Sequence, residues 1–245
     1  MIVGFVGSGS MAAAIARGWA GDREAMLFSD SGSGRAARLA EELGGEVASN
    51  AEIAERADFV VLAVKPAALD AVAPELGAAR KVVSVLAAVA VERLQAAFPG
   101  AEVLRVMPNV GVEVGRGVLC VAGEATADVR AKLDRLGRVV EIADADFDAA
   151  TAVMGCAPAY FALAVEAIAD AGVADGLDPQ LARELVVETA AGTAELLRSW
   201  EPAALRQAVA SPGGSTEAGL EALDREGARE AFEAAVRASL ERMRQ

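Results

Sequence analysis

The sequence contains no histidine, and this absence excludes more chemistry than any other feature of the chain. It rules out a histidine general base, a histidine metal site and a Ser-His-Asp triad. Tyrosine occurs once, as Tyr160, and lysine occurs only as Lys65, Lys81 and Lys132. Any reaction that the chain catalyses must therefore need little proton abstraction by protein side chains.

Cysteine, aromatic and basic residues are also scarce. The two cysteines, Cys120 and Cys156, form neither a zinc-binding spacing nor a disulfide framework, so we expect no metal site. Aromatic residues make up 4% of the chain against 54% hydrophobic residues, so we expect a core of Ala, Val and Leu. A formal net charge of −13 argues against a nucleic-acid or anionic-membrane partner.

Long hydrophobic runs are missing as well. The longest, residues 82–91, is interrupted by Ser84 and falls short of the ~20 residues that span a bilayer. The chain starts directly with an apolar stretch at residues 2–6, without the basic flank of a signal peptide. We therefore expect a cytoplasmic protein with no membrane partner.

Residues 1–146 alternate apolar strand candidates with Ala-rich helix candidates. We expect strands at 2–6, 25–29, 59–63, 82–85, 102–107, 118–121 and 138–142, and helices at 11–20, 35–43, 69–76, 91–98 and 126–136. This alternation predicts an α/β fold, a Rossmann-like doubly wound parallel sheet covered by helices on both faces.

Residues 147–245 carry no strand signal. We expect helices at 148–156, 159–171, 179–199, 202–210, 217–225 and 228–243. Several are apolar around most of their circumference, as in the Phe-Ala-Leu-Ala-Val sequence at 161–165, and such a helix must be buried. Roughly 100 residues form too thin a bundle to bury so much apolar surface. The sequence therefore predicts an all-helical dimerisation domain that packs against a second copy.

A glycine-rich segment follows the first expected strand. Gly7-Ser8-Gly9-Ser10-Met11-Ala12 matches the pattern G-x-G-x-x-A and opens an expected helix. The glycines permit a tight turn and a close approach to a pyrophosphate, and the first N–H groups of the helix attract its charge. In this βαβ context the segment predicts dinucleotide binding, with a purely structural turn as the alternative.

The segment after the second expected strand bears on the choice of cofactor. Asp30 lies where a carboxylate would bind the adenosine ribose and favour NAD. Ser31, Ser33 and Arg35 would instead hold the 2′-phosphate of NADP. In a third interpretation Asp30 only caps a turn or the next helix. We expect NADPH to be used at least as well as NADH.

Another break follows the strand expected at 59–63, in the sequence Ala63-Val64-Lys65-Pro66. Ligands of a doubly wound sheet bind beyond the carboxyl ends of its strands. Lys65 is therefore either a lysine beside the cofactor or a solvated residue after a strand.

A second glycine-rich segment, Ser211-Pro212-Gly213-Gly214-Ser215-Thr216, precedes the helix expected at 217–225. We call it the 211–216 loop. Glycines and small hydroxyl residues at a helix N-terminus expose backbone N–H groups, which hold a carboxylate without any Arg or Lys. The alternative is an ordinary interhelical turn with Thr216 as the helix N-cap.

Over essentially its whole length the chain resembles the pyrroline-5-carboxylate reductase family. The matching segments are residues 7–11, 63–66, 107–109, 158–160, 166–173 and 211–216. The resemblance implies NAD(P)H-dependent reduction of the C=N bond of 1-pyrroline-5-carboxylate to L-proline, the last step of proline biosynthesis. It also implies a homodimer with interlocked C-terminal helices, often assembled further into a decamer.

The resemblance also implies roles for individual residues. Thr216 would hydrogen-bond the ring nitrogen, Asn50 would contact the adenosine ribose, and Asn109 would belong to the substrate site. The substrate carboxylate would bind Ser211, Gly213, Gly214 and Ser215.

Some positions depart from the family pattern. Ser10 stands where the family usually has asparagine, and residues 86–88 replace an Ala-Ala-Gly-type turn, which we expect to crowd the nicotinamide side. Bulkier residues at 110–111 and 154–157 leave open a reductase of another cyclic imine or of a carbonyl acid. A non-catalytic nucleotide-binding regulatory protein is a further alternative, although it would not need the 211–216 loop.

Overall fold

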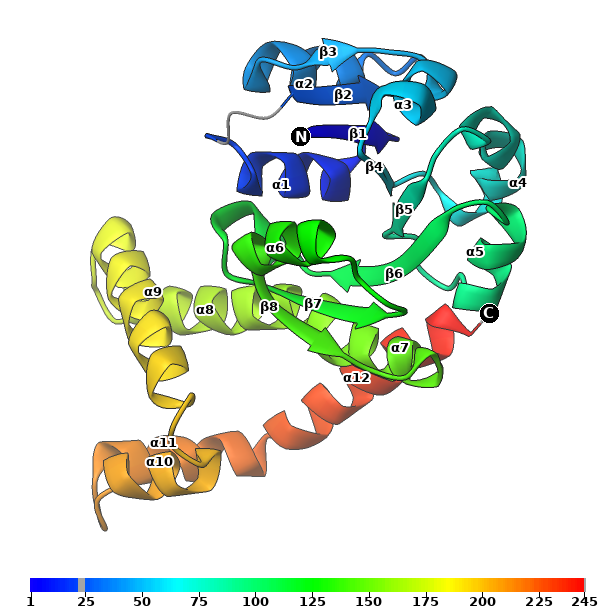
Figure 1. Ribbon diagram of the computed structural model, residues 1–245. Helices are drawn as coiled ribbons and strands as arrows, with labels where there is room; N and C mark the ends of the chain where they lie inside the picture. Colours follow the sequence, from blue (N-terminus) through cyan, green and yellow to red (C-terminus); the bar gives the residue numbers. More distant parts are fainter. Residues whose placement is uncertain (22–24, 245) are drawn as a thin grey trace. The chain divides into compact units, whose positions relative to one another are not determined.

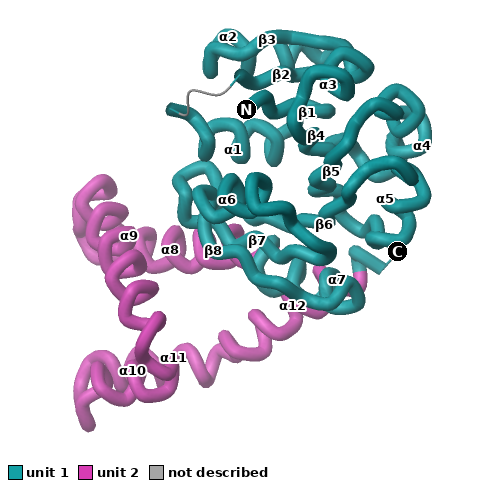
Figure 2. The backbone as a smooth tube through the Cα atoms, in the orientation of Figure 1, with its two compact units in different colours: residues 1–155, 242–245 teal, residues 156–241 magenta. Residues whose placement is uncertain are grey.

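The computed structural model describes residues 1–21 and 25–244, which divide into two compact units (Figure 2). Unit 1 comprises Met1–Gly155 together with the C-terminal residues from Arg242, and unit 2 comprises Cys156–Glu241. The division along the chain thus follows Gly155, whereas the sequence led us to expect it after residue 146.

Unit 1 is built on one eight-stranded sheet with the strand order β3-β2-β1-β4-β5-β6-β7-β8 (Figure 1). The strands are β1 (Ile2–Val6), β2 (Ala25–Ser29), β3 (Glu46–Val47), β4 (Phe59–Leu62), β5 (Lys81–Ser84), β6 (Glu102–Pro108), β7 (Gly117–Ala122) and β8 (Gly137–Glu141). Strand β1 lies between β2 and β4, so the direction in which strands are added reverses at β1. The predicted fold class is confirmed.

One pairing in this sheet differs from the expected parallel arrangement. Strands β1 to β6 run parallel, but β7 pairs antiparallel with β6, with Arg105 opposite Ala122. Only residues 109–116 connect the two strands, including the 3-10 turn η3 (Val110–Val114). A parallel crossover needs about a dozen residues or more, so this connection returns the chain antiparallel.

Short helices and turns link the strands of unit 1. They are α1 (Ser10–Gly18), α2 (Arg35–Leu43), α3 (Asn50–Arg56), η1 (Pro66–Ala68), α4 (Leu69–Val72), η2 (Ala73–Leu76), α5 (Val91–Ala97), α6 (Ala127–Leu136), η4 (Asp144–Asp146), α7 (Phe147–Ala150) and the π-turn η5 (Thr151–Gly155). The helix expected at 69–76 splits into α4 and η2, because Pro74 cannot donate an intrahelical hydrogen bond.

The core of unit 1 is built mostly of Ala, Val and Leu, as expected, and most of the few aromatic residues lie within it. Phe5 stacks on Phe28 with ring centroids 5.1 Å apart, and Trp19 meets Phe59 edge-on at 6.0 Å. All four side chains are at most 1% exposed. Aromatic pairs of this kind add stabilisation beyond the area they bury.

Unit 2 consists of α8 (Ala157–Ala174), α9 (Pro179–Leu196), α10 (Pro202–Val209), α11 (Ser215–Arg225) and α12 (Ala228–Met243), which reaches slightly beyond the unit. Within residues 156–241 only Ala182 is buried. Helix α8 exposes 68% of Phe161, 63% of Leu163 and 60% of Ile168. The apolar helix that the sequence leads us to expect in a core therefore has no core within a single chain.

By length and composition alone, the helical stretch Asp144–Ala174 could cross a membrane, since an 18-residue window within it has a mean hydropathy of 1.6. The same stretch carries the acidic residues Asp144, Asp146, Asp148, Glu166 and Asp170. Core helices of non-membrane proteins have similar composition, so this feature alone is weak evidence for a membrane.

Candidate functional site

The segments predicted to bind the cofactor lie at one edge of the sheet in unit 1, and so does Asn109, which was predicted for the substrate site. Gly7 follows β1, Asp30 follows β2, Ala63 follows β4 and Asn109 follows β6, and these strands run parallel. Their carboxyl ends therefore share an edge, and β1 marks the topological switch point where doubly wound sheets bind ligands.

Gly7 is fixed in a turn that a side chain would disrupt. Its φ is +92°, and an added Cβ would lie 2.6 Å from the carbonyl oxygen of Ala63. Its N–H donates to the carbonyl of Ser29 at 3.2 Å. The first glycine thus lets strands β1, β2 and β4 end close together, as the sequence leads us to expect.

Gly9 has the opposite environment. It is the N-cap of α1 with ordinary backbone angles, and no atom lies within 4 Å of the position that a Cβ would take. The first turn of α1 begins with Ser10 and Met11 and contains no acidic residue. Open space beside uncapped helix N–H groups fits the pyrophosphate of a dinucleotide.

Next to this loop lies a pocket of about 480 Å³, which we call the adenosine pocket. Its walls come from the end of β2, the segment leading into α2, the end of β3 and the start of α3, with Glu75 of η2 completing them. Asp30 and Asn50 both line it. In a dinucleotide-binding sheet, this is the place of the adenosine half of the cofactor.

The Asp30 carboxylate is held by its own loop. Its Oδ1 accepts from the N–H groups of Gly32 at 2.7 Å and Ser33 at 3.0 Å, and its Oδ2 accepts from Ser33 Oγ at 2.9 Å and Ala36 N at 2.8 Å. These hydrogen bonds, that of Ala36 foremost, lower the pKa of Asp30 to about 2. The capping interpretation of Asp30 therefore has direct structural support. Ser31, Ser33 and Arg35 lie exposed around it.

Residues 63–66 lie beside Gly7 at the end of β4. Ala63 and Val64 are half-buried, while Lys65 is exposed and precedes η1, which starts at Pro66. The contact between Ala63 and Gly7 brings this segment to the dinucleotide loop.

The side chain of Asn109 is occupied by main-chain groups of unit 1. Its Oδ1 accepts from Gly111 N at 3.2 Å and Val118 N at 3.1 Å, and its Nδ2 donates to the carbonyl of Met154 at 3.2 Å. Asn109 thereby caps η3 and ties η5 to the sheet. These contacts support a positioning role, with its predicted place in the substrate site resting on the resemblance.

In unit 2 the 211–216 loop connects α10 to α11, beside a pocket of about 490 Å³ lined by residues that include Arg206 and Glu217. Gly213 has a φ of +74°, and its N–H donates to Glu217 Oε2 at 2.7 Å. The Gly214 N–H donates to the carbonyl of Ser211 at 2.9 Å. The glycines therefore shape the loop, and the donors left for a ligand carboxylate are those of the first helical turn.

Thr216 is not the N-cap of α11. Gly214 takes that position, and Thr216 is the second helical residue, exposed, in a helix that starts at Ser215. Among the described residues nothing hydrogen-bonds its hydroxyl. The alternative of a capping Thr216 is thus wrong, and the hydroxyl is available to a ligand.

At residues 86–88 the structure corrects one expectation. Leu86 is 1% exposed and packs into the core rather than crowding the edge of the sheet. Ala88, where the family has a glycine-like turn, is instead the one non-glycine residue with positive φ among those described, at 56°.

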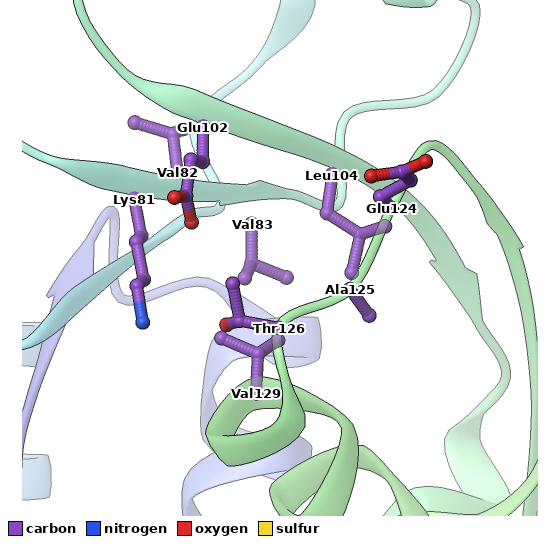
Figure 3. A pocket seen from close by; sticks show the side chains of 9 residues that line it. All are labelled: Lys81, Val82, Val83, Glu102, Leu104, Glu124, Ala125, Thr126 and Val129. Carbon is purple, nitrogen blue, oxygen red and sulfur yellow. The ribbon is translucent and has the colours of Figure 1, made fainter.

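A further cavity lies at the opposite edge of the sheet. Figure 3 shows it beside Lys81, the first residue of β5, and Thr126, just before α6. Its volume of about 10 Å³ is the size of one water molecule. Within residues 1–21 and 25–244, no group of three or more His, Cys, Asp or Glu side chains is arranged to hold a metal ion.

Two carboxylates, one beside the adenosine pocket and one beside the 211–216 loop, were not predicted from the sequence. Glu75 hydrogen-bonds the Asn50 side chain, and Glu217 hydrogen-bonds Gly213. Glu217 follows the 211–216 loop directly, so its position one turn after a glycine could have suggested it. No sequence signal marks Glu75, because only the tertiary fold brings it to Asn50.

Comparisons with known proteins agree with this geometry. Residues 144–245 match the family model for pyrroline-5-carboxylate reductase dimerisation, and residues 2–88 match that for NADP oxidoreductase, coenzyme F420-dependent. A pyrroline-5-carboxylate reductase of Synechocystis is 41% identical over 204 residues, covering 79% of this chain and 76% of that protein.

Two solved structures have the same fold over almost the whole chain. The 1-pyrroline-5-carboxylate reductase of Streptococcus pyogenes superposes with a TM-score of 0.89 at 30% identity, covering 99% of this chain and 98% of that one. The Plasmodium falciparum pyrroline carboxylate reductase with NADP bound has a TM-score of 0.84 at 26% identity, covering 99% and 97%. The resemblance found in the sequence is confirmed: the chain belongs to the pyrroline-5-carboxylate reductase family.

Proposed function

We propose that this chain is an NAD(P)H-dependent oxidoreductase that reduces the C=N bond of 1-pyrroline-5-carboxylate to give L-proline, the last step of proline biosynthesis. The observation that carries the proposal is the 211–216 loop. It combines an uncapped helix start with a free Thr216 hydroxyl, on a chain that also has a dinucleotide loop. A regulatory protein that only sensed the cofactor would not need this second loop.

The chemistry suits a chain without histidine. When bound, the reduced nicotinamide supplies a hydride to the imine carbon, and a protonated cyclic imine accepts it without a protein base. The chain then only has to align the reactants and bind the carboxylate. First-turn N–H groups at Ser215 and Thr216 would hold the carboxylate, and the Thr216 hydroxyl would hydrogen-bond the ring nitrogen.

For the cofactor we propose NADPH over NADH. The Asp30 carboxylate is already engaged by four groups of its loop, so it is poorly placed to select an unphosphorylated ribose. Ser31, Ser33 and Arg35 are exposed at the same loop. Ser31 and Arg35 would contact a 2′-phosphate, while the Ser33 hydroxyl already donates to Asp30. A family member with NADP bound shares the fold. A tenfold preference for NADH in kcat/KM would contradict this assignment.

We further propose that the chain works as a cytoplasmic homodimer, assembling into a decamer as family members often do. Unit 2 buries almost nothing by itself, and the exposed apolar side chains of α8 require a protein partner. This partner, rather than a membrane, accounts for the apolarity of Asp144–Ala174. The net charge of −13 argues against nucleic acid. A well-folded monomer in sedimentation at micromolar concentration would refute the dimer.

The direct test is oxidation of NADPH by the purified full-length chain with 1-pyrroline-5-carboxylate, followed by identification of L-proline as the product. Turnover with this substrate and formation of proline are the expected results. A panel of other cyclic imines and carbonyl acids tests the alternative substrates. Preference for another panel member by tenfold or more in kcat/KM would replace the proposed substrate.

A further inference from the structure

A chain of polar side chains runs along the carboxyl edge of the sheet, from the dinucleotide loop to the far wall of the adenosine pocket. Ser8 Oγ donates to the carbonyl of Ser29 at 2.9 Å, and Ser29 Oγ donates to Asn50 Oδ1 at 2.6 Å. Asn50 Nδ2 then donates to Glu75 Oε2 at 2.9 Å. Ser8 and Ser29 are buried, while Asn50 and Glu75 line the pocket.

Glu75 decides which end of the Asn50 amide faces which neighbour. A carboxylate accepts hydrogen bonds and donates none, so the amide nitrogen must face Glu75. Ser29 cannot make this choice, because a hydroxyl both donates and accepts. Without Glu75, a half-turn of the amide would exchange its donor and its acceptor at the wall of the pocket.

We propose that Glu75 is a positioning residue for the cofactor, which acts by holding the Asn50 amide in one orientation. One N–H and one lone pair of Asn50 then remain, in fixed places, for the hydroxyls of the adenosine ribose. Binding loses less entropy when such groups are preorganised. The inference rests on the proposed function in taking a nicotinamide dinucleotide as the ligand.

The test is the dissociation constant for NADPH, measured calorimetrically on the full-length wild type and on E75A, N50A and the double variant. E75A should weaken binding roughly 3- to 10-fold, the range expected for one hydrogen bond. In the N50A background, E75A should add no further loss, because Glu75 acts through Asn50. E75Q places an amide that both donates and accepts at the same reach, so it no longer fixes the orientation of Asn50 and should bind NADPH about as weakly as E75A.

Glu55 provides a matched control. It is an exposed glutamate on α3 itself and lines a pocket at the opposite edge of the sheet. E55A should therefore bind NADPH like the wild type. Glu75 is exposed too, so thermal melting of E75A and E75Q should match that of the wild type and exclude a folding defect.

Three results would overturn the inference: equal affinities of wild type and E75A, additive losses in the double variant, or an E75Q that binds NADPH as tightly as the wild type. Failure of the proposed function would look different. A wild type that binds NADPH but does not reduce 1-pyrroline-5-carboxylate would refute the reaction and leave the role of Glu75 standing. A wild type with no affinity for either dinucleotide would refute both.

Discussion

Arg105 in the middle of β6 is paired with Asp144 at the start of η4, with 2.8 Å between Arg105 Nη1 and Asp144 Oδ1. The Arg105 side chain is 5% exposed, and its guanidinium lies 4.1 Å from the centroid of the Phe147 ring. This ion pair holds η4, which precedes the helical domain along the chain, against the sheet of unit 1.

We expect Asp144→Ala to lower the free energy of unfolding by about 3 kcal/mol, because it leaves a buried charge without its partner. Arg105→Met should cost less, since it removes the buried charge and keeps an apolar side chain under Phe147. Urea unfolding of both variants checks the order. A smaller loss for Asp144→Ala than for Arg105→Met would contradict this account.

Gly9→Ala should fold normally and lose cofactor affinity. Its Cβ would enter the open space beside the first turn of α1, where we place the pyrophosphate. We expect the dissociation constant for NADPH to rise more than tenfold with little change in Tm. Gly7→Ala is the contrasting variant: its positive φ and its contact with Ala63 should lower the Tm as well. Unchanged NADPH affinity in Gly9→Ala would refute the placement.

Thr216→Ala should lower kcat by about 10²-fold, because loss of one preorganised donor at a reacting centre costs on the order of 10²–10³. NADPH affinity and Tm should change little, since Thr216 is not the N-cap of α11. Thr216→Ser, which keeps the hydroxyl, should retain most of the turnover. Steady-state kinetics give kcat, and thermal melting of the same preparations gives Tm. A fully active Thr216→Ala would exclude the catalytic role.

Ala88→Gly should stabilise unit 1 by about 0.5–1 kcal/mol, because a left-handed backbone costs an L-residue more than the entropy that glycine loses. The φ of Ala88 is 56°. The neighbouring Ala87 is also exposed but has no positive φ, so Ala87→Gly should not stabilise the fold. Urea unfolding of the two variants separates the effects. Equal changes in both would argue against strain at Ala88.

Asp30 should make stability depend on acidity. Its pKa falls from 3.8 to about 2 on folding, so its contribution is present above pH 4 and is lost as the pH falls towards 2. Asp30→Asn should therefore flatten the decline of stability between pH 4 and pH 2. Acid unfolding curves of wild type and variant test this, and parallel curves would contradict the hydrogen bonds seen in the loop.

The sequence by itself determined the fold class and most of the strands and helices, because these signals are local, whereas the antiparallel pairing of β7 appeared only in the structure. Continuous apolar runs predict the buried strands, and the Gly7–Gly9 spacing predicts the dinucleotide loop from backbone sterics alone. Strand β3 and helix α3 were not predicted: β3 has only two residues, and the Ser49-x-x-Glu52 capping box that marks the start of α3 was overlooked.

Only the tertiary structure decided how side chains are used. Asp30 could have bound a ribose, and the fold instead surrounds it with N–H groups of its own loop. Leu86 turned inward to the core, and Glu75 reached Asn50 from a turn 25 residues away. Hydrogen-bond partners and burial depend on which helices and strands pack against each other. Periodicity along the chain does not contain that information.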